Sequence, residues 1–278
     1  MQIYVINLDR HPARWQRMES LLQGLAYKRV AAVDGKTIEG PEQRDYSLPK
    51  TYEILSRYER GCILSHRSAW QEFLAGGDPY CCVLEDDVFI SPDFARFVND
   101  EAWIPKDCSL LKIETVQLEV CLSRKTIPCF DRQTARLCSL HLGTAAYIVS
   151  RRAAKILLAE TLQPALPMDL LFYEDSGRQK LHPVYQLVPA LCIQAKRKKD
   201  GIIFAEMESA IQPRVETKKS SAIPPAPETF HNKIKRELSR PIRQFFRLLD
   251  LFKDSMESAG RAVFDRFKGI RRCKVPFG

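Results

Sequence analysis

Three consecutive carboxylates, Glu85, Asp86 and Asp87, separate two apolar runs near the middle of the chain. The flanking segments, 82–84 and 88–90, are short enough to be buried strands. An unpaired carboxylate is costly to bury, and three clustered carboxylates raise one another's pKa because their charges repel. A divalent cation bound between the acids relieves both costs. The run therefore indicates either a metal-dependent site for a phosphorylated ligand or an exposed acidic turn. Oxygen-only ligands favour Mg²⁺ or Mn²⁺ over Zn²⁺.

The elements that must position these acids are predicted from hydrophobic periodicity. Expected strands are 2–8, 29–33, a strand leading to the acidic run, 110–113, 145–149 and 185–188, and expected helices begin at Pro12, Gly61 and Ser150. Strands that alternate with helices indicate an α/β domain with a mostly parallel, twisted sheet flanked by helices, over residues 1–195. In such sheets ligands bind beyond the carboxyl ends of strands, where the acidic run would lie.

The net charge of +9 over 278 residues is concentrated near the end of the chain. Residues 233–274 carry 13 Lys and Arg against 5 Asp and Glu, a net of +8, which leaves +1 for the remainder. Residues 196–230 have the composition of a linker. Residues 231–278 predict a basic amphipathic helical tail, which either binds an anionic membrane surface or packs on the domain. Nucleic acid is not an expected partner, because no recognised nucleic-acid motif is present.

The nine cysteines are odd in number and contain no CxxC pair. Because the start of the chain resembles a first strand and not a secretion signal, we expect reduced, structural cysteines and a cytoplasmic protein. Cys62 and His66 share a helix face, but two ligands alone do not predict a zinc site. No segment is apolar for long enough to predict a membrane span, so any membrane contact is expected to be peripheral, on the inner face of the cytoplasmic membrane.

Six sequence blocks resemble glycosyltransferase family 25, which includes bacterial lipooligosaccharide galactosyltransferases and collagen galactosyltransferases. They are 6–10 with Arg14 and Arg17, 31–35, 61–70, 84–88, 143–150, and the pair 167–169 and 189–194. These blocks occur in the family's order across roughly residues 1–195. The resemblance ends before the linker and carries no information about the tail.

The resemblance implies a GT-A-like fold, a nucleotide-sugar donor such as a UDP-sugar, and inversion at the anomeric carbon. A cation that bridges the donor diphosphate would stabilise the charge of the leaving group. Asp87 is the first candidate ligand, and Glu85, two residues back on an extended backbone, points the same way. Asp86 is expected to contact the nucleotide ribose or to support the site.

Inversion also requires a base that removes the proton of the acceptor hydroxyl. Asp169 is the leading candidate, since it lies in a family block and precedes an apolar segment. Its alternative role is to cap the segment 170–172. Glu174 and Asp175 are rival candidates.

The remaining candidate residues each have a structural alternative. Ser65 and His66 could contact the donor or metal, although a histidine on an apolar helix face is more often a hydrogen-bonded core residue. Other candidates are Arg14 for phosphate or a surface ion pair, Asp34 and Gly35 for the nucleotide-facing turn, and Gly143 and Thr144 for close approach of the sugar or tight packing.

The sequence thus predicts a metal-dependent inverting glycosyltransferase that moves a hexose, most simply galactose from UDP-galactose, to a lipid-linked surface glycan such as lipooligosaccharide. An enzyme that acts on a membrane lipid would benefit from a basic tail at an anionic membrane surface. Two other classes are compatible with the acids and the tail: a metal-dependent phosphohydrolase and a non-catalytic, membrane-associated glycan-binding protein.

Overall fold

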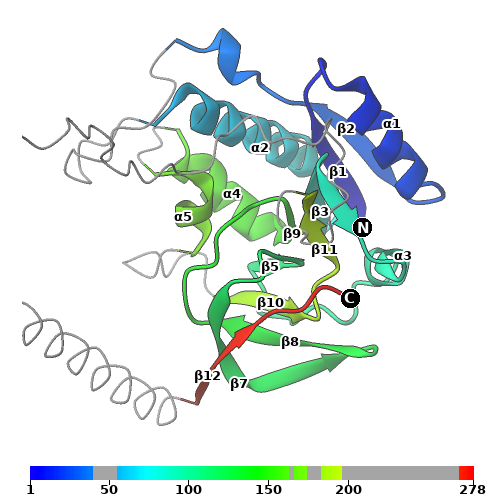
Figure 1. Ribbon diagram of the computed structural model, residues 1–278, viewed down its shortest axis with the longest axis vertical. Coiled ribbons are helices and arrows are strands. Elements are labelled where there is room, and N and C mark those ends of the chain that lie inside the picture. The colour runs from blue at the N-terminus through cyan, green and yellow to red at the C-terminus, as the bar shows by residue number, and fades with distance from the viewer. Residues whose placement is uncertain (40–54, 163–165, 174–182, 196–268) are drawn as a thin grey trace, which may run out of the picture. The chain divides into compact units, whose positions relative to one another are not determined.

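The computed structural model describes residues 1–39, 55–162, 166–173, 183–195 and 269–278 (Figure 1). The helices are α1 (Pro12–Leu21), the 3-10 turn η1 (Gly35–Thr37), α2 (Arg57–Ala75), α3 (Phe94–Val98), α4 (Arg151–Glu160) and α5 (Met168–Tyr173). The first strands are β1 (Gln2–Asn7), β2 (Tyr27–Ala31), β3 (Tyr80–Glu85), β4 (Val88–Ile90), β5 (Leu110–Lys112) and β6 (Glu114–Thr115). The later ones are β7 (Glu119–Cys129), β8 (Arg132–Leu137), β9 (Ala146–Ser150), β10 (Val184–Val188), β11 (Cys192–Gln194) and β12 (Ile270–Lys274).

Nine strands form one sheet in the order β12-β7-β8-β10-β5-β9-β3-β1-β2, and β4, β11 and β6 form a small second sheet. The prediction of an α/β domain is confirmed, but the prediction of a mostly parallel sheet was wrong. β1 pairs in parallel with β2 and β3, whereas β9 runs antiparallel between β3 and β5. The tight turn between β7 and β8 also requires an antiparallel pair. An apolar run predicts that a strand exists, but whether the strand runs parallel or antiparallel to its neighbours depends on the segments that connect them.

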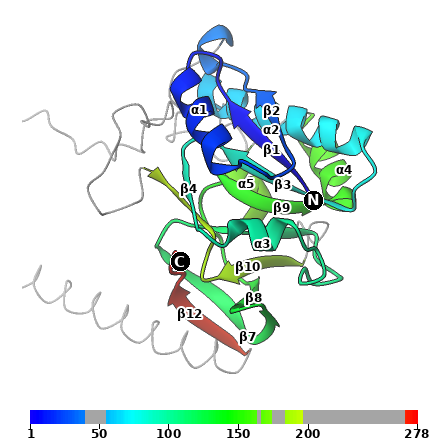
Figure 2. The same ribbon diagram turned by 90° about the vertical axis from the view of Figure 1, so that its right-hand side faces the viewer.

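The large sheet is covered on both faces because its central strands are apolar on both sides. On one face Tyr4, Val83 and Tyr147 pack in a cluster with Trp70 of α2 and Leu157 of α4. On the other face a second cluster joins the alternate strand residues to α1 and α3; it includes Val5, Leu84, Ile148, Met18 and Phe97. Figures 1 and 2 show the helices of the two layers on either side of β1, β3 and β9. This double burial fixes the strand register, and with it the position of the acidic run at the end of β3.

The final residues of the chain belong to the domain and not to a helical tail. β12 lies at the edge of the large sheet, beside β7. Val275 is fully buried, and its carbonyl oxygen accepts a hydrogen bond of 2.7 Å from the Thr115 hydroxyl. The prediction of a basic helical tail over 231–278 was therefore wrong for residues 270–278, where edge pairing and burial outweigh the basic composition. The rest of the predicted tail, up to residue 268, lies outside the described residues.

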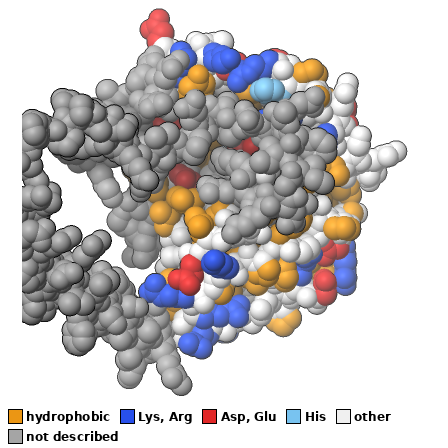
Figure 3. Space-filling model, viewed as in Figure 1, with side chains coloured by type: hydrophobic (Ala, Val, Ile, Leu, Met, Phe, Trp, Pro, Cys, Tyr) orange, Lys and Arg blue, Asp and Glu red, His pale blue; other side chains and the backbone are white. Residues whose placement is uncertain are grey.

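The surface charge of the described residues is mixed in sign. On the face drawn in Figure 3, Lys and Arg side chains lie among Asp, Glu and apolar side chains, in keeping with the net charge of +1 outside residues 233–274. Within the described part of the chain, no helix is both long and apolar enough to cross a membrane.

Candidate active site

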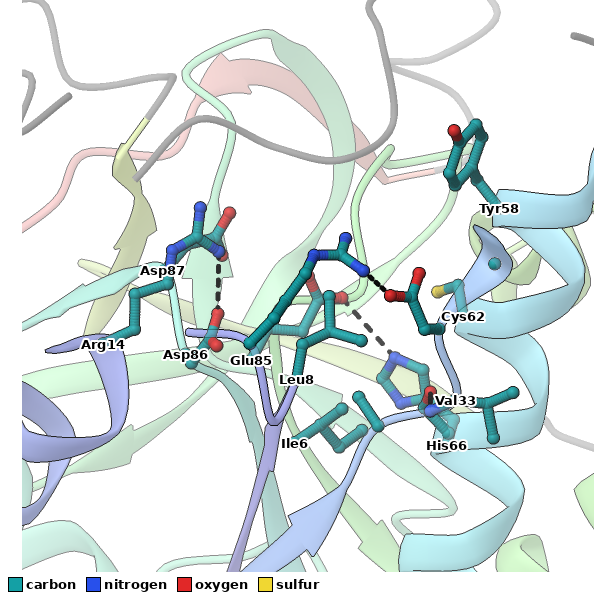
Figure 4. A pocket seen from close by; sticks show the side chains of 15 residues that line it. Ile6, Leu8, Arg14, Val33, Tyr58, Cys62, His66, Glu85, Asp86 and Asp87 are labelled. Atoms are coloured by element: carbon teal, nitrogen blue, oxygen red, sulfur yellow. Dashed lines mark hydrogen bonds and ion pairs between the residues drawn. The ribbon is translucent and has the colours of Figure 1, made fainter. Parts of the chain in front are cut away.

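The candidate site lies where the parallel strands β1, β2 and β3 end. Ile6 pairs with Glu85, and Asn7 pairs with Ala31, so the carboxyl ends of all three strands meet at one edge. The segments that follow these strands, together with α2, line a pocket (Figure 4). Its lining includes Glu85, Asp86 and Asp87. The expectation that the acidic run lies beyond the carboxyl ends of strands is thus confirmed.

Glu85 and Asp87 converge on a single atom. The Nε2 amide of Gln194 lies 3.4 Å from Oε2 of Glu85 and 3.3 Å from both carboxylate oxygens of Asp87. Thr144 also donates to Oε1 of Glu85, at 3.3 Å. Asp87 is buried, whereas the side chain of Glu85 is 25 % exposed toward the pocket. Two carboxylates that converge on one positively polarised group form an oxygen donor set of the kind that Mg²⁺ and Mn²⁺ prefer.

Asp86 has a different environment from its two neighbours. Its Oδ2 accepts a hydrogen bond of 2.6 Å from Asn7 on β1, and its Oδ1 pairs with Arg14 of α1 at 3.0 Å (Figure 4). Both side chains of this ion pair are less than a tenth exposed. Asp86 therefore supports the site by joining the end of β3 to β1 and α1. Arg14 lines the pocket, but it is already paired, and the surface ion pair that the sequence allowed is instead a buried one.

A buried Lys–Glu pair lies beside the acidic run. Nζ of Lys112 is 3.4 Å from Oε1 of Glu114, and both side chains are fully buried. Burial raises the pKa of Glu114; the Lys112 ammonium opposes this shift and the Glu85 carboxylate adds to it. Lys112 also donates to the carbonyl oxygen of Gly143 at 3.0 Å. Gly143 has φ of +89°, and a Cβ there would lie 3.2 Å from a Glu114 oxygen, so glycine suits both the backbone and the packing. The Lys112–Glu114 pair thereby holds the loop that contains Gly143 and Thr144 in place.

The loop after β2 is held against α2 by small residues. A Cβ on Gly61 would lie 2.8 Å from the carbonyl oxygen of Val33, so only glycine allows this approach. The Ser65 hydroxyl donates to Gly61 at 2.6 Å and accepts from the Val33 amide at 2.9 Å. Gly35 begins the turn η1, which the Asp34 side chain caps. Ser65 and Gly35 therefore shape the wall of the pocket.

His66 belongs to a buried polar chain that reaches Glu85. The indole of Trp70 donates to the Tyr147 hydroxyl at 2.9 Å, and that hydroxyl lies 2.8 Å from Nδ1 of His66. Nε2 of His66 lies 3.5 Å from Oε1 of Glu85. His66 is thus both a hydrogen-bonded core residue and a residue that faces the acidic run (Figure 4). The half-buried thiol of Cys62 faces the same region; burial, followed by the carboxylates of Glu85 and Asp169, raises its pKa well above the ordinary value.

An ion pair joins Arg10 and Asp34, and both residues line the pocket. Their side chains are 30 % and 25 % exposed. Both side chains are only partly exposed, so water has access to the pair and weakens it relative to a buried one. This arginine follows β1 directly, and its position in the sequence gave no indication that it faces Asp34.

Asp169 lies in the first turn of α5 and is half-buried. Its Oδ1 accepts a hydrogen bond of 2.9 Å from the Leu170 amide, one of the first-turn amides that lack a partner within a helix. Because α5 begins at Met168, Asp169 lies within the first turn and does not precede the helix as an N-cap does. α5 packs on α2, where the ring of Phe172 lies 6.1 Å from that of Trp70. The hydrogen bond from Leu170 is compatible with the role of a base, since it uses only one carboxylate oxygen. The rival candidates Glu174 and Asp175 lie outside the described residues.

The structure brings most of the sequence-predicted residues to one pocket. Those that line it are Arg14, Asp34, Gly35, Ser65, His66, Glu85, Asp86 and Asp87. Thr144 contacts Glu85 directly. Sequence reasoning missed the role of Gln194, although this residue ends a block that had been singled out, and it missed Asn7 and Arg10. Asn7 lies 79 residues from its partner Asp86, and Arg10 lies 24 residues from Asp34. Gln194 lies 107 residues from Asp87, so no local sequence pattern connects any of these pairs.

Comparison with known proteins adds an independent observation. The sequence model of glycosyltransferase family 25 (LPS biosynthesis protein) matches residues 1–172. The lacto-N-neotetraose biosynthesis glycosyltransferase LgtB of Neisseria meningitidis serogroup B is 34% identical over 153 residues, which cover 51% of this chain and 56% of LgtB. The lipooligosaccharide biosynthesis protein lic2B of Haemophilus influenzae is 27% identical over 204 residues, which cover 69% of this chain and 75% of lic2B. The chain thus spans little more than half the length of LgtB.

Among solved structures, a glycosyltransferase involved in the glycosylation of the major capsid of PBCV-1 matches with a TM-score of 0.39 and 10% identity. That match covers 69% of this chain and 92% of the solved one.

Proposed function

We propose, since the chain belongs to glycosyltransferase family 25, that it is a metal-dependent inverting hexosyltransferase. Its donor is a UDP-sugar, most simply UDP-galactose, and its acceptor is a lipid-linked surface glycan such as lipooligosaccharide. The observation that carries this proposal is the convergence of Glu85 and Asp87 on one point in a pocket at the carboxyl ends of three parallel strands. The galactose donor and the glycan acceptor follow from the family resemblance.

Glu85 and Asp87 are proposed to hold Mn²⁺ or Mg²⁺. When bound, the cation would neutralise charge on the donor diphosphate as the leaving group departs. Without the ion, the Gln194 amide holds the two carboxylates together, and it would yield this point to a bound cation. Thr144 holds Glu85, and the buried Asp86–Arg14 pair holds the end of β3. Because these supports come from separate elements, the ligands are arranged before any ion binds, which reduces the cost of binding.

The remaining steps are assigned to Arg10, which lines the pocket, and to Asp169, which comes from the family resemblance. Arg10 would exchange Asp34 for a donor phosphate, because a guanidinium binds phosphate with two hydrogen bonds. Asp169 would accept the proton of the acceptor hydroxyl with Oδ2, the oxygen that does not accept from the Leu170 amide. Inversion requires the acceptor to attack from the face opposite to the diphosphate, so the proposal needs Asp169 and Arg10 on opposite sides of the bound sugar.

The basic segment before β12 is proposed to contact the inner face of the cytoplasmic membrane. Residues 233–268 carry most of the net charge of the chain, and basic residues near an anionic surface contribute about 1 kcal/mol each. Since β12 belongs to the sheet, a truncation would damage the domain. Replacing Arg236, Arg240, Arg243 and Arg247 by Gln tests the segment instead: the variant should lose co-sedimentation with anionic vesicles and keep UDP release. Undiminished sedimentation would refute the membrane proposal.

The central test is UDP release from a panel of sugar nucleotides, with and without a glycan acceptor, in Mn²⁺ or in EDTA. We expect acceptor-dependent release from UDP-galactose that EDTA abolishes. Asp87→Asn should reduce the rate about a hundredfold or more, as losses of charge-stabilising groups commonly do. Asp131→Asn, which changes an exposed carboxylate in a surface ion pair, is the matched control and should leave the rate unchanged. Absence of metal-dependent release from every nucleotide would refute the proposal, and phosphate release without an acceptor would indicate a phosphohydrolase.

A further inference from the structure

A second group of metal-ligating atoms lies beside the acidic run. Cys62 and His66 are four residues apart on α2 and therefore project from one face of the helix. Glu85 reaches the same point from the end of β3 (Figure 4). One ligand atom from each of the three residues lies within 4.8 Å of the others. Among the described residues this is the only group of three or more such side chains.

The imidazole of His66 provides an independent indication of a ligand. The side chain is 1 % exposed, and its Nε2 has no hydrogen-bond partner although it points at Glu85. Its Nδ1 is anchored by the Tyr147 hydroxyl, whose oxygen also accepts from Trp70. That oxygen has two lone pairs and can accept from an Nδ1–H as well, so it can hold His66 in the tautomer in which Nε2 binds a cation. A metal-bound histidine commonly has this arrangement, with its other nitrogen fixed by a hydrogen bond.

We propose that Cys62, His66 and Glu85 bind a thiophilic divalent cation of the Zn²⁺ class, at a second site that overlaps the oxygen-only pair of Glu85 and Asp87 through Glu85. A thiolate, an imidazole and a carboxylate form a donor set typical of Zn²⁺, whereas Mn²⁺ and Mg²⁺ prefer oxygen. Three protein ligands leave a fourth tetrahedral position open. All three residues line the pocket, so an ion that they held would lie at the pocket wall.

The two sites share Glu85, and this sharing has a functional consequence that rests on the proposed transferase activity. Oε1 of Glu85 faces His66 and Thr144, whereas Oε2 faces Gln194 and the Asp87 side. A cation held by Cys62 and His66 would draw the Glu85 carboxylate toward α2. The proposed Mn²⁺ site at Glu85 and Asp87 would then lose the negative charge of one of its two ligands. Zn²⁺ should therefore inhibit the enzyme by competition with Mn²⁺ for Glu85.

Binding is tested with Co²⁺ alone as a spectroscopic substitute for Zn²⁺ on the full-length protein. We expect one equivalent of Co²⁺ to produce a thiolate-to-cobalt charge-transfer absorption, which Zn²⁺ abolishes by displacement. Cys62→Ser should remove this absorption, and His66→Gln should weaken Co²⁺ binding about tenfold or more. Cys138→Ser is the matched control, because Cys138 is exposed and lies outside the group, and it should leave the absorption intact. An absent signal in the wild type, or one that survives in Cys62→Ser, would overturn the proposal.

A second comparison separates this inference from the proposed function. Asp87→Asn should retain the cobalt absorption while it loses Mn²⁺-dependent UDP release, because Asp87 is not one of the three ligands. If the wild type shows no transferase activity but the absorption obeys the pattern above, the metal site stands without the catalytic proposal. If activity is present, the Zn²⁺ concentration for half-inhibition should rise about tenfold or more in Cys62→Ser. Unchanged Zn²⁺ inhibition in that variant would refute competition through Glu85.

Discussion

Replacing Asp86 with Asn tests whether the middle carboxylate of the run supports the structure or binds the donor. The substitution keeps the size of the side chain and removes its charge. In the wild type, two donors converge on this carboxylate: Asn7 at 2.6 Å and Arg14 at 3.0 Å. An amide has only one oxygen, so one of the two donors would face an NH₂ group instead.

The expected cost follows from burial. Arg14 and Asp86 are 7 % and 9 % exposed in their side chains, so the guanidinium cannot recover its hydration when the carboxylate is lost. Breaking a buried pair by removing one partner costs about 3–5 kcal/mol. This is a large share of a total stability of about 5–15 kcal/mol. For a domain of this size it corresponds to a fall in melting temperature of about 6–20 °C.

The assay is equilibrium urea unfolding of the wild type, Asp86→Asn, Arg14→Met and the double variant. Because both single variants break the same pair, the double variant should cost less than their sum, with a coupling energy of about 0.5–3 kcal/mol. Asp131→Asn is the control, since its carboxylate is 64 % exposed and its loss should change stability by less than about 0.5 kcal/mol. If Asp86→Asn is as stable as the control yet no longer binds the nucleotide sugar, Asp86 contacts the donor and the structural argument fails.

Two further predictions concern the supports of the pocket and of the small sheet. Gly61→Ala should destabilise the protein by about 1–3 kcal/mol in urea unfolding, because its Cβ would lie 2.8 Å from the Val33 carbonyl oxygen. The control is Gly77→Ala, which should be nearly neutral because a Cβ there meets nothing within 4 Å. Equal effects of the two substitutions on the free energy of unfolding would refute the packing argument. Burial raises the pKa of Asp93, but hydrogen bonds from Arg132 and Ser91 outweigh it and hold the pKa below its ordinary value. A lowered folded-state pKa stabilises the protein above the unfolded value of about 3.9, and this contribution disappears as pH falls through the folded-state pKa. Asp93→Asn should therefore lose stability at pH 7 and show a shallower decline between pH 5 and 2 in urea unfolding; an unchanged pH profile would contradict this.

Much of the fold could be predicted from the sequence because its signals are local. The helix expected to begin at Ser150 is α4, and the Ser150 hydroxyl accepts from the Ala153 amide, as an N-cap does. The apolar run before Glu85 forms β3, buried on both faces. The direction of β9 and the edge position of β12 could not be predicted in this way, since both depend on partners far along the chain.

The sequence by itself determined that three adjacent acids follow a buried strand, that the surrounding segments form an α/β domain, and that the blocks resemble glycosyltransferase family 25. These conclusions rest on residue type, spacing and order, which local physics constrains. The tertiary structure decided how the three acids differ. Asp86 pairs with Arg14, Asp87 faces Gln194, and Glu85 lies between Gln194 and His66. The physical reason is that a carboxylate takes its role from the charges and donors around it, and in this protein they come from strands and helices 19 to 109 residues away.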